Sequence, residues 1–171
     1  MLAHKLVTDQ GSPALHVSVS RVIPAGPLTT YDALSDITTI GQRSPETQAA
    51  KWLTHGQKFK GYNHIGPLYR WSTVCTVTAD APGRTFAFDV AWPSKISWRY
   101  DLTAVDDGTE VTLTMTKIKP QAAPVVAIQR MVGFHDRAEH LRGGIEQTLN
   151  RLAQQLQQSS RHPSTPSIMV R

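Results

Sequence analysis

Apolar and polar residues alternate along several short segments in the first two thirds of the chain. The clearest segment is 96–103, where Ile96, Trp98 and Tyr100 alternate with polar residues. The other segments with this pattern are 15–20, 71–77, 86–92 and 111–115. A period of two is typical of strands that bury one face. Turn signals with Gly or Pro separate the segments at 66–67, 81–83, 93–94 and 107–108, so the pattern predicts an antiparallel meander.

Two further segments have helical spacing. Between residues 28 and 40 apolar residues recur every three or four positions, with an interruption near Ser35, which predicts one or two short helices that end before Gly41. The same spacing extends from Ile128 to Leu156. It predicts one long amphipathic helix, with Pro124 placed well for its first turn. The apolar stripe of this helix is long enough to pack against a meander.

The chain has the size of one domain. Its 171 residues are enough to bury a substantial core, and neither an internal repeat nor a linker divides it. Residues 1–13 have no sustained period, and the segment SSRHPSTPS (159–167) is polar and of low complexity, with two prolines. We therefore expect a single ordered domain over residues 14–158, with a flexible segment at each end.

Composition favours a globular protein of a reducing compartment. Hydrophobic residues make up 40% of the chain and charged residues 18%. No apolar run approaches the roughly 20 residues of a membrane-spanning helix, and the first residues lack the apolar core of a secretory signal. The single cysteine, Cys75, excludes an internal disulfide. We expect a cytoplasmic protein, and the sequence leaves open whether it forms a homodimer.

Charge and motifs exclude several functional classes. The net charge of +5 raises the question of a nucleic-acid partner. Because the basic residues are scattered along the sequence, we interpret them as a mildly basic surface and expect no nucleic-acid partner. The sequence contains no phosphate-binding loop, paired cysteines or GxSxG motif. We therefore expect neither a metal nor another cofactor.

The order of the elements and five segments of sequence resemble the START-like superfamily, also called Bet v 1-like or SRPBCC. More narrowly, the chain resembles the polyketide cyclase/dehydrase and lipid-transport family of small bacterial proteins. The segments that carry the resemblance are HVSVSRVIPAGPLTTYDALSDITTIG (16–41), SPE (44–46), 59–90, WRYDLTAVDDGTEVTLT (98–114) and IEQTLNRLAQQL (145–156). Similar sequences often have Trp just before SPE, where this chain has Arg43. If that Trp lines a cavity mouth in relatives, the mouth here should be more polar and basic.

The resemblance implies an α+β helix-grip fold. In this fold a curved antiparallel sheet of about seven strands wraps around a long C-terminal helix, with two short helices after the first strand. Members of the family share a cavity between sheet and helix. Their assigned roles extend from lipid carriage to aromatic ring closure, and they have no universal catalytic signature.

The candidate site residues are those whose pattern directs them toward such a cavity. Trp98 and Tyr100 share one strand face, and a buried Trp N–H or Tyr hydroxyl needs a hydrogen-bond partner that a ligand could provide. His135 falls on the apolar stripe of the helix, where it could serve as an acid or base. The predicted ligand-binding residues are Asn63, Trp71, Thr73, Phe88, Trp98, Tyr100, Met131 and His135. For each residue taken singly, the alternative is a filled core whose polar groups are satisfied by neighbours.

Three functions follow from this interpretation. The first is binding of a small hydrophobic or aromatic molecule, such as a lipid or a polyketide-like compound. The second is a cyclase or dehydratase without a metal or nucleotide cofactor, with His135 and then Tyr100 as catalytic residues. Positioning of a flexible chain can itself contribute much of the rate of ring closure. The third is a protein or RNA interaction module that uses the outer surface.

Overall fold

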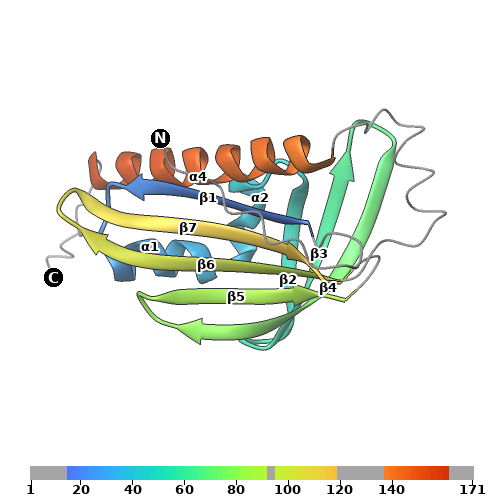
Figure 1. Ribbon diagram of the computed structural model, residues 1–171. Coiled ribbons are helices and arrows are strands. Elements are labelled where there is room, and N and C mark those ends of the chain that lie inside the picture. Colours follow the sequence, from blue (N-terminus) through green and yellow to red (C-terminus); the bar gives the residue numbers. More distant parts are fainter. Residues whose placement is uncertain (1–14, 92–94, 119–136, 162–171) are drawn as a thin grey trace, which may run out of the picture.

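Seven strands form one antiparallel sheet in the computed structural model, which describes residues 15–91, 95–118 and 137–161 (Figure 1). The strands lie in the order β1-β7-β6-β5-β4-β3-β2. Their bounds are β1 His16–Ile23, β2 Thr47–Thr54, β3 Lys58–Ile65, β4 Tyr69–Ala81, β5 Thr85–Val90, β6 Ile96–Val105 and β7 Gly108–Lys117. Strands that follow one another from β2 to β7 pair as hairpins, and β1 pairs with β7. The antiparallel meander that the pattern predicts is thus confirmed, and so are the about seven strands that the resemblance implies.

Three short helical segments connect β1 to β2. They are α1 (Pro27–Ser35), the 3-10 helix η1 (Ile37–Thr39) and α2 (Ile40–Arg43). Asp36 interrupts the helical run because its carboxylate accepts a hydrogen bond of 3.0 Å from the Thr38 N–H and so begins η1. The prediction of short helices here is confirmed.

The predicted end of these helices before Gly41 is wrong, because α2 continues to Arg43. Gly41 is the point at which α2 touches β2 rather than the end of a helix. A Cβ atom at this position would lie 1.8 Å from the Gln48 carbonyl oxygen. Glycine here therefore permits close packing of helix on strand.

The long C-terminal helix α4 (Arg137–Arg161) packs against β1 and β7 (Figure 1). Its buried residues keep the predicted spacing of three and four: Leu141, Ile145, Leu149, Leu152 and Leu156. The N-terminal part of the predicted helix, with Pro124, Met131 and His135, lies outside the described residues. At the other end, α4 continues to Arg161, three residues into the segment 159–171.

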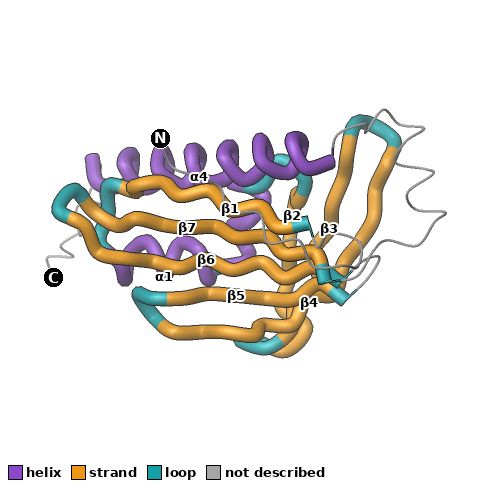
Figure 2. The backbone as a smooth tube through the Cα atoms, in the orientation of Figure 1, coloured by secondary structure: helices purple, strands orange, loops and turns teal. Residues whose placement is uncertain are grey.

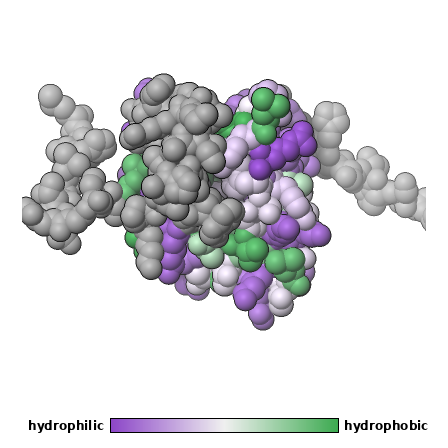
Figure 3. All heavy atoms as spheres, turned by 90° about the vertical axis from the view of Figure 1, so that its right-hand side faces the viewer, coloured by the Kyte–Doolittle hydropathy of each residue, from purple (hydrophilic) through white to green (hydrophobic). Residues whose placement is uncertain are grey.

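The sheet curves so that its concave face meets the helices (Figure 2). Register shifts interrupt the pairing of β2 with β3 and of β4 with β5, and such bulges bend strands. The core lies on this concave side and includes Phe59, Leu113 and Met115, which are at most 2% exposed. Figure 3 views the end of the molecule that is on the right in Figure 1, where described hydrophobic and hydrophilic side chains adjoin. No described helix is long and apolar enough to cross a membrane.

Candidate functional site: an aromatic cavity under the helix

A cavity of about 140 Å³ lies between the concave face of the sheet and α4. Strands β3 to β7 form its floor, α4 covers it, and the turn from α2 to β2 closes one side. Its wall contains six aromatic side chains: Phe59, Tyr69, Trp71, Phe88, Trp98 and Tyr100. Its polar side chains include Ser44, Glu46, Thr47, Asn63, Thr73, His140 and Thr148.

Strand alternation and register bring the wall residues together. Asn63 of β3 pairs with Trp71 of β4, and Phe88 of β5 pairs with Trp98 of β6, so each pair points to the same face. Gly61 of β3 leaves space beside them. A Cβ atom there would lie 3.0 Å from the Thr73 hydroxyl oxygen.

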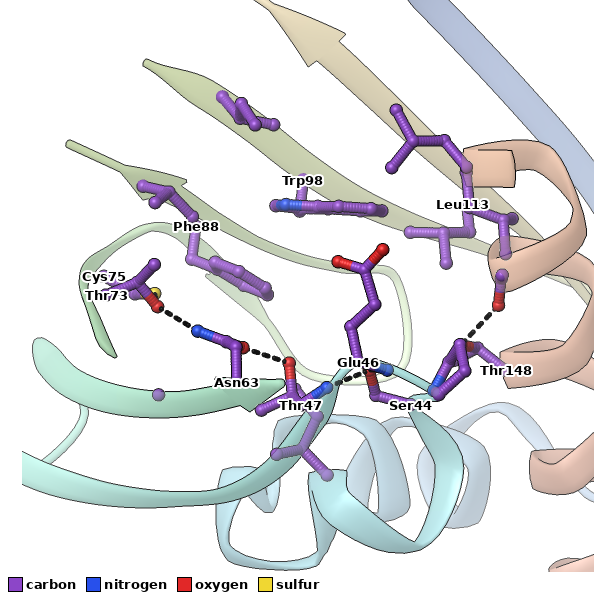
Figure 4. A pocket seen from close by; sticks show the side chains of 18 of the residues that line it. Ser44, Glu46, Thr47, Asn63, Thr73, Cys75, Phe88, Trp98, Leu113 and Thr148 are labelled. Carbon is purple, nitrogen blue, oxygen red and sulfur yellow. Dashed lines mark hydrogen bonds between the residues drawn. The ribbon is translucent and has the colours of Figure 1, made fainter. Parts of the chain in front are cut away.

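Three polar side chains of the cavity wall are joined by hydrogen bonds (Figure 4). The Thr47 hydroxyl donates to the side-chain oxygen Oδ1 of Asn63 over 2.8 Å. The side-chain amide Nδ2 of Asn63 donates to the Thr73 hydroxyl over 3.3 Å. The Cys75 thiol also donates to Thr73, over 3.8 Å. Since the Thr73 oxygen accepts two hydrogen bonds, its own proton remains available to donate into the cavity.

Glu46 and His140 stand where the cavity reaches solvent. Their side chains are 23% and 42% exposed, and His140 Nε2 lies 3.1 Å from Glu46 Oε1. The Ser44 hydroxyl accepts hydrogen bonds from the N–H groups of Glu46 and Thr47 and so holds the turn. Figure 4 shows the Glu46 carboxylate directed toward the Trp98 ring. Sequence reasoning quoted SPE as a family motif but did not place Glu46 or His140 in the site.

Tyr100 is a cavity residue with an available hydroxyl. It is 7% exposed, and its hydroxyl has no hydrogen bond to any residue that the structure describes. Burial raises the pKa of the Tyr100 hydroxyl, while the positive charge of Arg43 opposes this by less. The phenol therefore stays protonated at neutral pH and can donate a hydrogen bond to a ligand.

Arg43 does not make the cavity mouth basic, so that expectation is wrong. The residue is 2% exposed and is absent from the cavity wall. Its guanidinium folds back along α2 and donates to the Thr39 hydroxyl over 2.7 Å. Burial lowers the pKa of the Arg43 guanidinium, and the influence of Tyr100 and Asp36 partly offsets this.

The structure brings six of the eight predicted ligand-binding residues into the cavity wall. These six are Asn63, Trp71, Thr73, Phe88, Trp98 and Tyr100. Met131 and His135 lie outside the described residues. Ligand contact by all eight stays a prediction, and so does a catalytic role for His135 and Tyr100.

The charge of the cavity wall limits what it can hold. Within the described ranges, no Lys or Arg lines the cavity, and Glu46 is its only carboxylate. The one basic side chain, His140, is engaged by Glu46. No group of three or more potential metal ligands occurs among the residues that the structure describes. The wall is thus suited to neutral molecules with aromatic or apolar bodies.

Alkaline pH should reveal the burial of Cys75. The thiol is 3% exposed, and burial raises its pKa to about 11, although the hydrogen bond to Thr73 lowers it. Between about pH 9 and pH 11 only the unfolded chain loses this proton, which favours unfolding. When the pH rises from ~8 to ~10.5, we expect the free energy of unfolding to fall in both the wild type and Cys75→Val. The fall should be larger in the wild type by about 2 kcal/mol. Denaturant unfolding at the two pH values measures this, and equal losses would contradict it.

The curved sheet, the covering helix and the cavity between them define a START-like helix-grip protein. The chain belongs to the polyketide cyclase/dehydrase and lipid transport family, whose model matches residues 14–157. No match was found among curated proteins.

Solved structures share this fold. The Polyketide_cyc-like protein Cgl2372 from Corynebacterium glutamicum is 24% identical, with a TM-score of 0.57, and the match covers 90% of this chain and 98% of that one. Protein MLL2253 from Mesorhizobium loti is 17% identical, with a TM-score of 0.59 and coverage of 84% and 98%. The di-domain ARO/CYC StfQ from the steffimycin biosynthetic pathway is 11% identical, with a TM-score of 0.66 and coverage of 86% and 52%.

Proposed function

We propose that this protein binds a small, uncharged, aromatic or apolar molecule in the cavity under α4. The observation that carries the proposal is a wall with six aromatic side chains and, among the described residues, no Lys or Arg. Family membership supports ligand binding in general, and the cavity wall supports the ligand's chemical class.

The volume limits the size of the buried part of the ligand. A cavity of about 140 Å³ holds roughly one aromatic ring or a short acyl segment. A ring of that size buries about 150 Å² of apolar surface, which contributes about 4 kcal/mol before association costs. A larger polycyclic or acyl compound would extend past Glu46 and His140 into solvent.

The polar groups would orient the ligand rather than supply most of its affinity. The hydroxyls of Thr73 and Tyr100 can donate to a carbonyl or hydroxyl oxygen. At the mouth, the Glu46 carboxylate can accept from a ligand hydroxyl, whereas it would repel a ligand carboxylate. A phenol, an alcohol or a ketone therefore suits this site better than a fatty acid.

The direct test compares two probes that share one ring. p-Cresol is neutral at pH 7, and p-toluate carries a carboxylate. We expect p-cresol to raise the melting temperature and to give saturable binding in calorimetry, while p-toluate binds at least about tenfold more weakly. Native mass spectrometry and solvent extraction of the freshly purified protein would identify a co-purifying ligand. A chain that binds neither probe and carries no apolar molecule would contradict the proposal.

Glu46→Gln should change the selectivity of the site. The amide keeps the size of the side chain and removes the negative charge at the mouth, so repulsion of a carboxylate is lost. We expect the preference for p-cresol over p-toluate to shrink about tenfold, with p-cresol affinity changed by less than about threefold. Calorimetry on both probes measures this. Glu110→Gln, an exposed carboxylate on β7 that is absent from the cavity wall, is the matched control and should leave the preference unchanged.

A second candidate function is a cyclase or dehydratase reaction in the same cavity. The observation that favours it is an acid–base pair, Glu46 and His140, in a wall that also contains the protonated hydroxyl of Tyr100. The Glu46–His140 pair removes the proton next to a ketone while Tyr100 donates a hydrogen bond to the ketone oxygen. The same pair then returns that proton to the β-hydroxyl group, which leaves as water as the C=C bond forms. The likeness in fold to StfQ, an ARO/CYC protein of a biosynthetic pathway, agrees with this candidate.

Tyr100→Phe separates binding from catalysis. If the chain dehydrates the aldol of benzaldehyde and acetone, we expect the variant to lose about 100-fold in rate. Its affinity for p-cresol should fall by less than about tenfold, since one neutral hydrogen bond contributes about 1 kcal/mol. Absorbance of the conjugated product measures turnover. If the wild type dehydrates this substrate no faster than buffer alone does, the protein is not a dehydratase for this substrate. The binding proposal would be unaffected.

A further inference from the structure

The chain has a long stretch without carboxylates. Residues 47–79 contain no Asp or Glu, but they contain Lys51, Lys58, Lys60 and Arg70. These residues form β2, β3 and most of β4. The cations look scattered in the sequence, so only the folded sheet shows whether they act together.

The sheet brings these four cations to one face. The residues that alternate with them, including Phe59, point to the core and the cavity, so the cations point to the outer side of the same strands. Lys60 of β3 pairs directly with Lys51 of β2. We call this outer surface of β2, β3 and β4 the basic face.

The basic face is unusual in its electrostatics. Like charges directly opposite each other destabilise a sheet, yet Lys51 and Lys60 are direct neighbours. Both ammonium groups lie over the ring of Tyr62, at 5.9 and 5.4 Å from its centroid. None of the four cations forms an ion pair within the part of the chain that the structure describes.

Exposed apolar side chains adjoin these cations. Val74, which pairs with Lys60, is 45% exposed, and Leu53 is 51% exposed. Leu68, in the turn between β3 and β4, is 92% exposed. Figure 3 views the end of the molecule that is on the right in Figure 1, where β3 and β4 lie. Outside the grey atoms, hydrophobic and strongly hydrophilic side chains are next to one another in this view.

We propose that the basic face and the Leu68 turn dock on a bilayer that contains anionic phospholipid. Cations with exposed apolar groups between them match such a surface, since headgroups attract the cations and the interface accepts the apolar side chains. A single-stranded nucleic acid is the weaker match. Stacking of bases requires free aromatic rings, but two ammonium groups cover Tyr62, and Tyr69 and Trp71 line the cavity. The proposal is independent of what the cavity holds.

Vesicle co-sedimentation with the full chain tests this docking. We expect binding to phosphatidylcholine vesicles that contain about 30% phosphatidylglycerol, weak binding to pure phosphatidylcholine, and loss of binding as salt rises. The double variant Lys51→Glu/Lys60→Glu should weaken binding at least about 25-fold, because each cation near an anionic surface contributes about fivefold. It keeps like charges opposite each other but loses both cation–π contacts with Tyr62, so we expect a loss of stability that leaves the protein folded, which a thermal melt checks. Leu68→Ser should weaken binding about tenfold.

The matched control changes the same amount of charge elsewhere. Arg21→Glu/Arg84→Glu alters exposed residues on β1 and in the turn before β5, and should change vesicle binding by less than about threefold. Equal losses in the two double variants would overturn the proposal, since net charge alone would then explain the binding. Equal binding to both kinds of vesicle would also overturn it. Binding of a single-stranded RNA that Lys51→Glu/Lys60→Glu abolishes, without vesicle binding, would assign the basic face to nucleic acid instead.

Discussion

Thr73→Phe is expected to weaken binding of p-cresol at least about 100-fold while the protein stays folded. Thr73 lies on β4 with its side chain in the cavity wall, next to Gly61 of β3. A phenyl group would occupy the space of about 140 Å³ that one aromatic ring of a ligand needs. Exclusion of that ring removes about 4 kcal/mol of apolar burial, which corresponds to a loss of about 1000-fold before the site relaxes.

The control for this variant is the next residue on the same strand. Val74 points to the opposite side of β4 and is 45% exposed, so Val74→Phe adds a phenyl group without entering the cavity. Calorimetry and thermal melts on both variants separate filling of the cavity from a general effect on β4. If Thr73→Phe binds p-cresol as the wild type does, the ligand site is not this cavity.

Gly108→Ala is expected to lower the free energy of unfolding by about 3 kcal/mol. Gly108 begins β7 with φ at 138°, a backbone conformation that L side chains rarely adopt. A Cβ atom there would also lie 2.1 Å from the Ile23 carbonyl oxygen at the end of β1. Backbone strain and the forced shift of β1 contribute about 1–3 kcal/mol each. Denaturant unfolding at neutral pH measures the loss.

Gly56→Ala separates these two causes. Gly56 also has positive φ, at 69°, but a Cβ atom there would meet nothing within 4 Å. We expect this variant to lose about 1 kcal/mol, which is the backbone cost alone. Equal losses at the two positions would show that the contact with β1 contributes nothing and that the β6–β7 turn can move away from Ile23.

Local patterns predicted five of the seven strands and the direction of many side chains, but they did not mark β2 and β3. A period of two placed Trp98 and Tyr100 on one face of a strand, and both line the cavity. Turn signals at residues 66–67, 81–83 and 107–108 separate strands in the structure as predicted. These features depend on neighbours along the chain, which is why sequence reasoning finds them.

Those patterns did not predict contacts between segments that are distant in the sequence. Gly41 resembles a helix end, but its role is close packing of α2 on Gln48 of β2. Arg43 is the charged last residue of α2, and its burial depends on how α2 packs. His140 has the spacing of a surface residue of a helix, and it meets Glu46 only because α4 lies over the turn before β2.

The sequence by itself determined the fold class, because hydrophobic periodicity and turn residues act over short distances and agree along most of the chain. It also determined six of the wall residues, since alternation decides which side of a strand a residue faces. Only the tertiary structure decided which charges lie in the cavity and which form the basic face. Those properties depend on strand order, register and the packing of α4, which join residues far apart in the sequence. Glu46 and His140, for example, are 94 positions apart.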